Sequence, residues 1–272
     1  MTKTPLPEFE RPPIVEAYLG VEFAPIAALQ SQYFVLFWSQ VRADYPKIEL
    51  QMPLPSQIEK FEKPLAQQAF FEINVSPFVD NRYWLISQDE VRLMQLQNSR
   101  FLWNWRKGET KTPYPRYDLV LKPQFTREWE RFLVFLDTER IERPSILQCE
   151  VSYVNHIEIG DGWESIADWK NIFTFMGYTR QPQFLPTPES SHHKMQFEIQ
   201  LEQGRLHVDV LRAVRLSDQK QLISFTLTAR GRPSSSDTAG IMKWFDLGRE
   251  WVVRGFTDLT SDYIHKHWGR TA

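Results

Sequence analysis

One segment, residues 91–106, restricts the fold of this chain more than any other. Two alternating runs, Val91–Gln97 and Arg100–Arg106, flank the dipeptide Asn98-Ser99, which suits a two-residue hairpin turn. Such a turn fixes the register of the two strands, so that Leu96 lies opposite Phe101. The sequence therefore predicts an antiparallel hairpin here, within a sheet whose two faces differ in chemistry.

One face of the predicted hairpin is apolar and the other is rich in side-chain amides. An antiparallel sheet with one apolar face is normal, but amides on a sheet need solvent, a partner or each other as hydrogen-bond partners. We therefore keep three interpretations of the amide face: a solvated surface, a binding groove and an internal polar network. The apolar face carries Met94, Leu96, Phe101, Trp103 and Trp105, and the amide face carries Gln95, Gln97, Arg100, Asn104 and Arg106.

Alternating and helical patterns predict the remaining elements, while the prolines of residues 46–81 predict a connection without a long helix. The pattern is that of an α+β protein with two antiparallel sheets, each covered by helix. We expect a first half, residues 1–160, with a βαββαβ-like order and a tightly associated second half, residues 161–272, with the order βββα. Strands are predicted over 14–23, 82–87, 146–159, 193–202, 206–210 and 221–230, and helices over 26–44, 126–140 and from Asp237 to Tyr263.

The charge balance argues against a general attraction to anionic partners, although a local basic patch stays possible. With 32 basic and 34 acidic residues the net charge is −2, so no global field attracts nucleic acid or an anionic membrane. No apolar run approaches the ~20 residues of a membrane-spanning helix, and the first residues lack the apolar core of a signal peptide. The single cysteine, Cys149, fits a reducing compartment. We expect a cytoplasmic protein that makes no membrane contact.

No motif for nucleophilic, phosphate-binding or zinc chemistry occurs in the sequence, which lacks G-x-S-x-G, Walker, G-x-G-x-x-G and H-E-x-x-H patterns. Cys149 lies on the apolar face of its predicted strand, where a thiol is buried and inert. A turn at Gln203-Gly204 would place Glu198 opposite Asp209, which fits an acid–base couple, a cation site or, more simply, a solvated face. We expect no catalytic residue set, no metal and no cofactor.

The candidate site is the amide face, extended by the predicted strand 146–159. If that strand pairs with the hairpin, its Asn155 and His156 lie beside the hairpin amides. We expect a non-catalytic binding or interaction protein that uses this polar sheet face to bind a protein partner. The candidate binding residues are Gln95, Gln97, Asn104, Arg106, Asn155 and His156.

Short sequence blocks stand in order along nearly the whole chain: Phe9–Glu16, Leu19–Phe23, Gln95–Gln97, Phe101–Arg106, Tyr114–Tyr117, Tyr153–Ile157, Phe256, Leu259-Thr260 and Trp268–Arg270. Through these blocks the chain resembles a sporadically distributed family of bacterial proteins of about this length, for which no activity is assigned. The resemblance implies a bacterial, cytoplasmic globular protein. It also implies an accessory gene, of the kind found in phage defence and toxin–antitoxin pairs. One departure is Arg249-Glu250, where the family often has His before Glu, and this argues against a catalytic histidine there.

Two alternative functions follow. The chain is an enzyme or toxin-type component of a phage-defence or toxin–antitoxin system, acting on nucleic acid or nucleotide. In that case His156 serves as a general base and Arg106 or Arg116 holds an anion. Alternatively it is a structural subunit of a larger assembly, which would require a broad exposed apolar patch. Nucleic-acid binding by a sheet face is not favoured, because the hairpin's aromatic rings share its apolar face.

Overall fold

The structure is a computed structural model that describes residues 5–61, 81–108, 113–176, 184–199 and 203–271. Its strands are β1 (Ile14–Phe23), β2 (Lys47–Gln51), β3 (Arg82–Ile86), β4 (Arg92–Gln97), β5 (Arg100–Arg106), β6 (Ile146–Glu158), β7 (His192–Ile199), β8 (Gly204–Val214) and β9 (Gln221–Gly231). Its α-helices are α1 (Ser31–Val41), α2 (Lys122–Thr138), α3 (Trp169–Ile172), α4 (Thr238–Leu259) and α5 (Asp262–His267).

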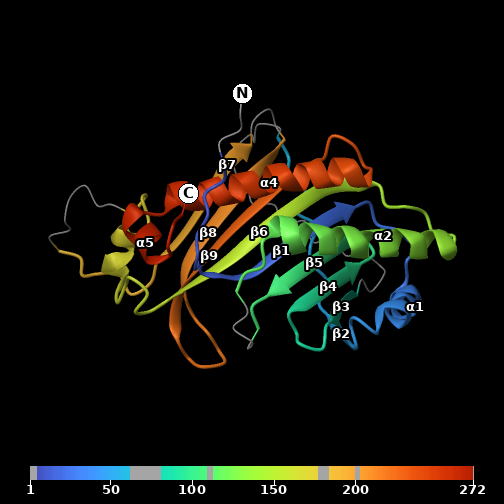
Figure 1. The fold of residues 1–272 in the computed structure, drawn as a ribbon, viewed down its shortest axis with the longest axis horizontal. Coiled ribbons are helices and arrows are strands. Elements are labelled where there is room, and N and C mark those ends of the chain that lie inside the picture. Colours follow the sequence, from blue (N-terminus) through green and yellow to red (C-terminus); the bar gives the residue numbers. More distant parts are fainter. Residues whose placement is uncertain (1–4, 62–80, 109–112, 177–183, 200–202, 272) are drawn as a thin grey trace.

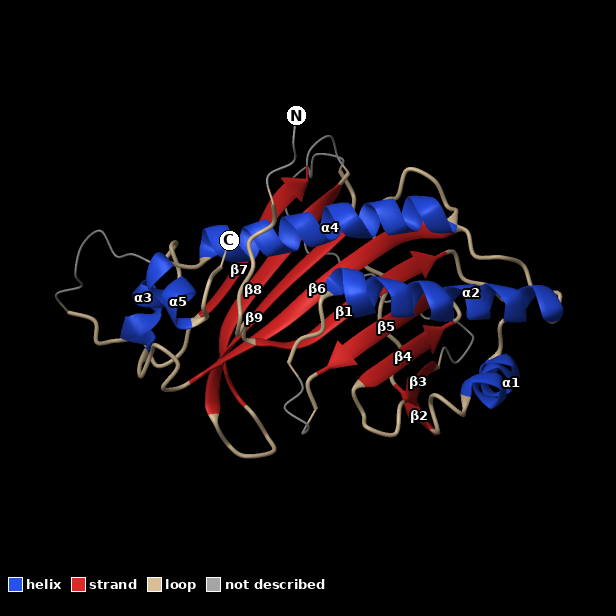
Figure 2. Cartoon of the chain, viewed as in Figure 1, coloured by secondary structure: helices blue, strands red, loops and turns tan. Residues whose placement is uncertain are grey.

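The strands form one nine-stranded antiparallel sheet in the order β2-β3-β4-β5-β1-β6-β9-β8-β7. The α+β class is confirmed, but the expectation of two separate sheets was wrong. The two halves share one sheet because β1 and β6 pair along their lengths, with Leu19 opposite Val151. Figures 1 and 2 show α2 and α4 side by side across one face of this sheet.

The topology repeats although the sequence does not. In the first unit β1 pairs with β5, the last strand of the series β3-β4-β5, and α2 follows. In the second unit β6 pairs with β9, the last strand of β7-β8-β9, and α4 follows. The two units meet at the β1–β6 pair, so β6 belongs topologically with the second unit. A domain boundary at residue 160 stays a prediction.

The first hairpin has the predicted register, with Gln97 opposite Arg100 and Met94 opposite Trp103. The second hairpin was predicted wrongly. Glu198 pairs with Arg205 rather than Asp209, because Ile199 lies opposite Gly204. The shift is even, so each side chain keeps its predicted face.

Helix boundaries and one strand also differ from expectation. α2 begins at Lys122, before the predicted Thr126, because Pro123 suits the first turn and a π-helical turn, Tyr117–Leu121, leads into it. The side chain of Asp237 caps α4 by accepting from Gly240 N at 2.8 Å, as predicted. The proline-rich connection also contains β2, a strand at the edge of the sheet that was not among the predicted strands.

Aromatic rings fill the space between the sheet and its helices. Phe101 of β5 lies 5.3 Å from Trp129 and 5.6 Å from Phe125 of α2, measured between ring centroids. Phe125 in turn meets Phe245 of α4 at 4.8 Å, so the two helices share one core. The aromatic share of 14% is therefore largely structural.

Helix α4 approaches the sheet closely at Gly248. A Cβ atom built there would lie 3.0 Å from Val151 Cγ2, tighter than ordinary van der Waals contact. This confirms that the glycine on the apolar stripe of the helix marks a close approach to a sheet.

Among the described residues, no helix has the length and apolar character needed to cross a membrane.

We expect Phe101→Ala to lower the free energy of unfolding by about 3–5 kcal/mol, because Phe101 is fully buried against three α2 rings. Urea unfolding followed by circular dichroism measures the change. The matched control is Phe184→Ala, whose ring is 93% exposed and should leave stability within about 0.5 kcal/mol. Equal effects of the two substitutions would contradict this core assignment.

Candidate functional site

The sheet has a second face, opposite α2 and α4, that we call the polar face. Alternation places on it every second residue of the paired strands. Many of its side chains are buried, among them Gln97, Arg100, Asn104 and Gln148. The polar face carries Glu16, Tyr18, Glu22, Gln95, Gln97, Arg100, Asn104, Arg106, Gln148, Glu150, Ser152, His156, Thr228, Arg230, Arg205 and His207.

Hydrogen bonds link the amides of the polar face to each other. Gln95 Nε2 donates to Asn104 Oδ1 at 3.0 Å, and Asn104 Nδ2 donates to Glu16 Oε1 at 2.6 Å. Arg82 and Trp84 of β3 both donate to Gln95 Oε1. Burial raises the pKa of Glu16, although the bond from Asn104 and the charge of Arg106 partly offset this. This part of the amide face is thus an internal polar network.

A buried ion pair lies beside these amides. Arg100 Nη2 donates to Glu22 Oε2 at 2.6 Å, and the two side chains are 10% and 7% exposed. The same Nη2 donates at 3.1 Å to the main-chain oxygen of Pro55. Arg100 therefore connects the sheet to a segment that lies over it.

That segment, residues 52–61, crosses the polar face as an extended chain outside any strand, and we call it the strap. Its prolines, Pro53 and Pro55, favour an extended backbone. Most of its side chains, including those of Met52, Gln57 and Lys60, are exposed. The sheet therefore contacts the strap mainly through main-chain atoms.

Two glutamines of the polar face each hold the strap by a donor and an acceptor. Gln97 Oε1 accepts from Leu54 N at 3.0 Å while its Nε2 donates to Leu54 O at 3.2 Å. Gln148 Oε1 accepts from Glu59 N at 2.9 Å while its Nε2 donates to Gln57 O at 3.0 Å. Because these bonds go to main-chain N–H and C=O groups, they do not depend on the side chains of the strap residues.

At its far end the strap inserts a carboxylate into the sheet. Glu59 Oε1 pairs with His207 Nε2 at 2.5 Å, and Oε2 accepts from Arg205 Nη1 at 2.8 Å. Burial raises the pKa of Glu59, but the hydrogen bonds from His207 and Arg205 outweigh it, so the pKa lies below the ordinary 4.5. The ionised carboxylate therefore anchors the strap at neutral pH.

Four of the six predicted site residues lie together on the polar face of the first unit, and the other two lie on β6, away from them. Gln95, Gln97, Asn104 and Arg106 lie on neighbouring strands. His156 shares their face but lies across β1, because β6 pairs with β1 and not with the hairpin. Asn155 points to the helix side, as the alternation along β6 requires.

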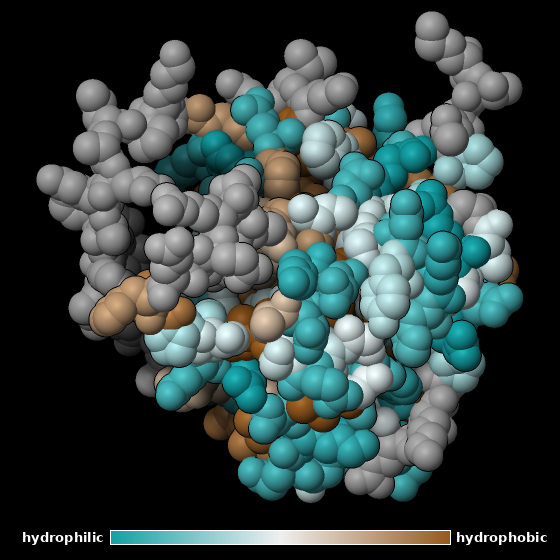
Figure 3. Space-filling view, turned by 90° about the vertical axis from the view of Figure 1, so that its left-hand side faces the viewer, coloured by the Kyte–Doolittle hydropathy of each residue, from teal (hydrophilic) through white to brown (hydrophobic). Residues whose placement is uncertain are grey.

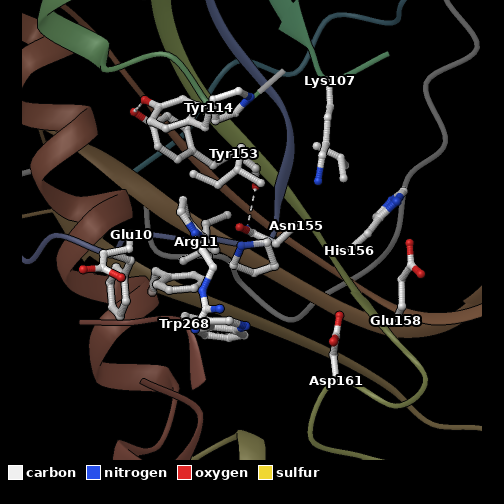
Figure 4. A pocket seen from close by; sticks show the side chains of 18 of the residues that line it. Glu10, Arg11, Lys107, Tyr114, Tyr153, Asn155, His156, Glu158, Asp161 and Trp268 are labelled. Atoms are coloured by element: carbon white, nitrogen blue, oxygen red, sulfur yellow. Dashed lines mark hydrogen bonds between the residues drawn. The ribbon is translucent and has the colours of Figure 1, made fainter. Parts of the chain in front are cut away.

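A second candidate region is a cavity of about 1160 Å³ beside the N-terminal arm, residues 7–15 (Figure 4). Asn155 Nδ2 donates to Phe225 O at 2.9 Å, which leaves Asn155 Oδ1 buried without a partner in the described structure. Figure 4 shows Arg11 and Trp268 on one side of the cavity and His156 on the other. The cavity is thus lined by charged and aromatic side chains.

His156 and Arg116 both line this cavity, whereas Arg106 turns to β3 and β4. Arg106 Nη2 donates to Glu90 O at 3.2 Å, and its guanidinium lies 5.7 Å from the Trp84 ring centroid. Burial lowers the pKa of His156, and the charge of Arg215 lowers it further. Arg116 forms an ion pair with Glu8 at 3.2 Å.

The candidate site derived from the sequence missed three residues that hold the strap, Gln148, Arg205 and His207, and the strap residue Glu59 that they bind. The alternation along β6 and β8 already placed Gln148 and His207 on the polar face. Nothing in the sequence marked Glu59, because a long connection carries no periodic pattern.

Metal and thiol chemistry find no support in the described residues. Within those ranges, no group of three or more His, Cys, Asp and Glu side chains is placed to hold a metal ion. Cys149 is buried, as predicted, and burial raises the pKa of its thiol far above the ordinary value.

The described residues include a number of exposed large apolar side chains. At the end of the molecule that carries α3 and α5, apolar side chains lie scattered among hydrophilic ones (Figure 3). The exposed large apolar residues are Val35, Leu36, Leu50, Met52, Leu119, Val134, Ile159, Phe184, Leu185, Phe197, Val214, Leu216 and Tyr263. They belong to many different elements.

Comparison with known proteins does not assign the chain to a family. No protein family, no curated protein sequence and no solved structure matches this chain. The arguments that follow therefore rest on the geometry of the polar face.

We expect Glu59→Gln to lower the free energy of unfolding by about 2 kcal/mol at pH 7, because two charge-assisted bonds to the carboxylate are weakened. The pKa of Glu59 is lower in the folded than in the unfolded chain. Its contribution is therefore present above about pH 4.5 and lost as the pH falls through the lowered pKa.

Urea unfolding of both proteins between pH 3 and pH 7, on the order of five points, measures this difference. Glu142→Gln, at an exposed position, is the control and should match the unmodified chain throughout. A deficit of Glu59→Gln that is independent of pH would show that the carboxylate charge does not anchor the strap.

Proposed function

We propose that this chain is a non-catalytic binding protein whose polar sheet face holds an extended segment of polypeptide by its main chain. The observation that carries the proposal is the paired bonding of Gln97 and Gln148 to peptide units of the strap. In this structure the strap occupies the part of the polar face formed by Gln97, Arg100, Gln148 and Arg205, which we call the groove. A segment of a protein partner would take the same place.

The contacts support recognition of main chain rather than of a particular sequence. Four side chains of the sheet, Gln97, Arg100, Gln148 and Arg205, make six hydrogen bonds to strap main-chain atoms. Each such bond contributes about 0.5–1.5 kcal/mol. Recognition of an extended peptide through its main chain is an established mode of protein interaction.

The strap crosses the strands instead of lengthening the sheet. It contacts side chains of β4, β5, β6 and β8 in turn, so it lies over the face and not along an edge. The bonds come from side chains because the main-chain groups of those strands already pair within the sheet. A partner segment would therefore need no free strand edge.

A loosened variant of the full chain, Leu54→Pro with Glu59→Ala, tests the proposal. Proline removes the Leu54 N–H that Gln97 accepts, and alanine removes the carboxylate anchor. We expect a fluorescent peptide of residues 52–61 to bind this variant measurably by anisotropy. Binding to the unmodified chain should be at least ~10-fold weaker, because its own strap competes at high effective concentration.

A change in the peptide isolates the main-chain contact while the protein stays intact. A peptide with Leu54→Pro should bind the loosened variant ~10-fold more weakly than the matched Leu54→Ala peptide, because only the former lacks the N–H. Circular dichroism verifies that the variant is folded. Absence of binding to a folded loosened variant, or equal binding of the two peptides, would refute the proposal.

The cavity beside the N-terminal arm favours a second candidate function, an enzyme or toxin-type component acting on a nucleotide or nucleic acid. The observation behind it is that a His156 side chain with a lowered pKa and Arg116 line one cavity. A neutral imidazole accepts a proton, as a general base must.

Under this second function, expression of the unmodified chain should arrest bacterial growth and His156→Ala should restore it. Colony counts after induction, with a stability measurement to show that the variant folds, decide the matter. Growth that is unaffected by the unmodified chain would count against the second function.

A further inference from the structure

We infer that the groove contains a carboxylate-recognition pocket, formed by Arg205, His207 and Gln148. Its partner is then an extended acidic peptide in which an acidic residue stands two positions before an aromatic one. The inference rests on the proposed function and names the kind of partner that the same groove takes. The strap residues Glu59 and Phe61 serve as the template for that partner.

The pocket contacts the polar groups of Glu59 from several sides. One carboxylate oxygen pairs with His207, the other accepts from Arg205, and the main-chain N–H donates to Gln148. The side chain of Glu59 is 10% exposed, whereas those of Gln57 and Lys60 are exposed. The polar face therefore binds the side chain of Glu59 as well as its main chain.

Arg205 contacts three groups of the strap, a carboxylate, a main-chain oxygen and an aromatic ring. Its Nη1 donates to the Glu59 carboxylate and, at 2.8 Å, to the main-chain oxygen of Lys60. Its guanidinium also lies 4.5 Å from the centroid of the Phe61 ring, a cation–π contact. Because one rigid planar group makes all three contacts, it fixes the spacing between the acidic residue and the aromatic ring.

The charges around the pocket require an anion. Arg205 and His207 of β8 are joined by Arg230 of β9, whose charge also interacts with Glu59. Arg230 is itself paired with Glu150 of β6 at 2.5 Å, so that carboxylate is engaged elsewhere. The side chain of Arg205 is only 24% exposed, and a partly buried guanidinium without an acceptor is costly.

The strap therefore competes in cis with the partner. Any segment that enters the groove displaces Glu59 from Arg205 and His207, so it needs its own acidic residue to replace that carboxylate. A neutral segment would leave the cation of Arg205 without its acceptor. This gives the groove a preference for acidic segments on top of its recognition of main chain.

A pair of peptides tests the pocket on the loosened variant, Leu54→Pro with Glu59→Ala, in the full chain. The probe is the peptide of residues 52–61, compared with the same peptide carrying Glu59→Gln. At pH 7 we expect the glutamine peptide to bind at least ~10-fold more weakly, because charge-assisted bonds are stronger than neutral ones. A Ser56→Ala peptide, changed at an exposed position, is the control and should bind as the parent does.

A substitution in the protein provides the reciprocal test. Adding Arg205→Gln to the loosened variant should abolish the preference for the glutamate peptide, and His207→Gln should reduce it. Circular dichroism and thermal unfolding show whether each variant folds. If Arg205→Gln fails to fold, the His207→Gln variant and the peptide pair still decide the question.

The outcomes separate this inference from the proposed function. Equal binding of the glutamate and glutamine peptides would overturn the carboxylate pocket while main-chain recognition stands. Absence of binding by either peptide would overturn both. A preference for glutamate that survives both the Arg205→Gln and the His207→Gln substitutions would place the recognition elsewhere and overturn the pocket as described.

Discussion

The antiparallel pairing of β1 with β6 is the interaction on which the rest of the structure depends. It joins two topologically similar units at their first strands, so that neither unit leaves an edge at the centre. The helices α2 and α4 then share one aromatic core through Phe125 and Phe245. On the other side the pairing produces one continuous polar face, with Gln97 in the first unit and Arg205 in the second.

A polar sheet face of this size is stable only when its groups are bonded. In part of the face the side chains hydrogen-bond to each other, as Gln95 does to Asn104 and Asn104 does to Glu16. The remainder bonds to the strap, which supplies main-chain donors and acceptors and one carboxylate. The strap therefore supplies hydrogen-bond partners to the polar face and also shows what kind of segment the groove binds. The first role favours tight binding of the strap, whereas exchange for a partner segment requires weaker binding.

The sequence predicted correctly which face of its strand most side chains occupy, but it did not predict which strands lie next to each other in the sheet. Alternation assigned Gln95, Gln97 and Asn104 to one face, and the Asn98-Ser99 turn gave the correct register, because both depend on residues close in the chain. The pairing of β6 with β1 depends on residues more than a hundred positions apart, for which no local pattern exists. Asn155 and His156 were grouped with the hairpin amides for that reason.

By itself, then, the sequence determined the α+β class, the apolar and polar faces of the main strands, the buried Cys149 and the cap at Asp237. Only the tertiary structure decided that there is one sheet and that the strap crosses it. The physical reason is that the first set depends on local backbone geometry and the second on contacts between distant segments. Side-chain alternation is set by backbone geometry within a strand, whereas the bonds of Gln148 and Arg205 to the strap arise only when distant segments meet.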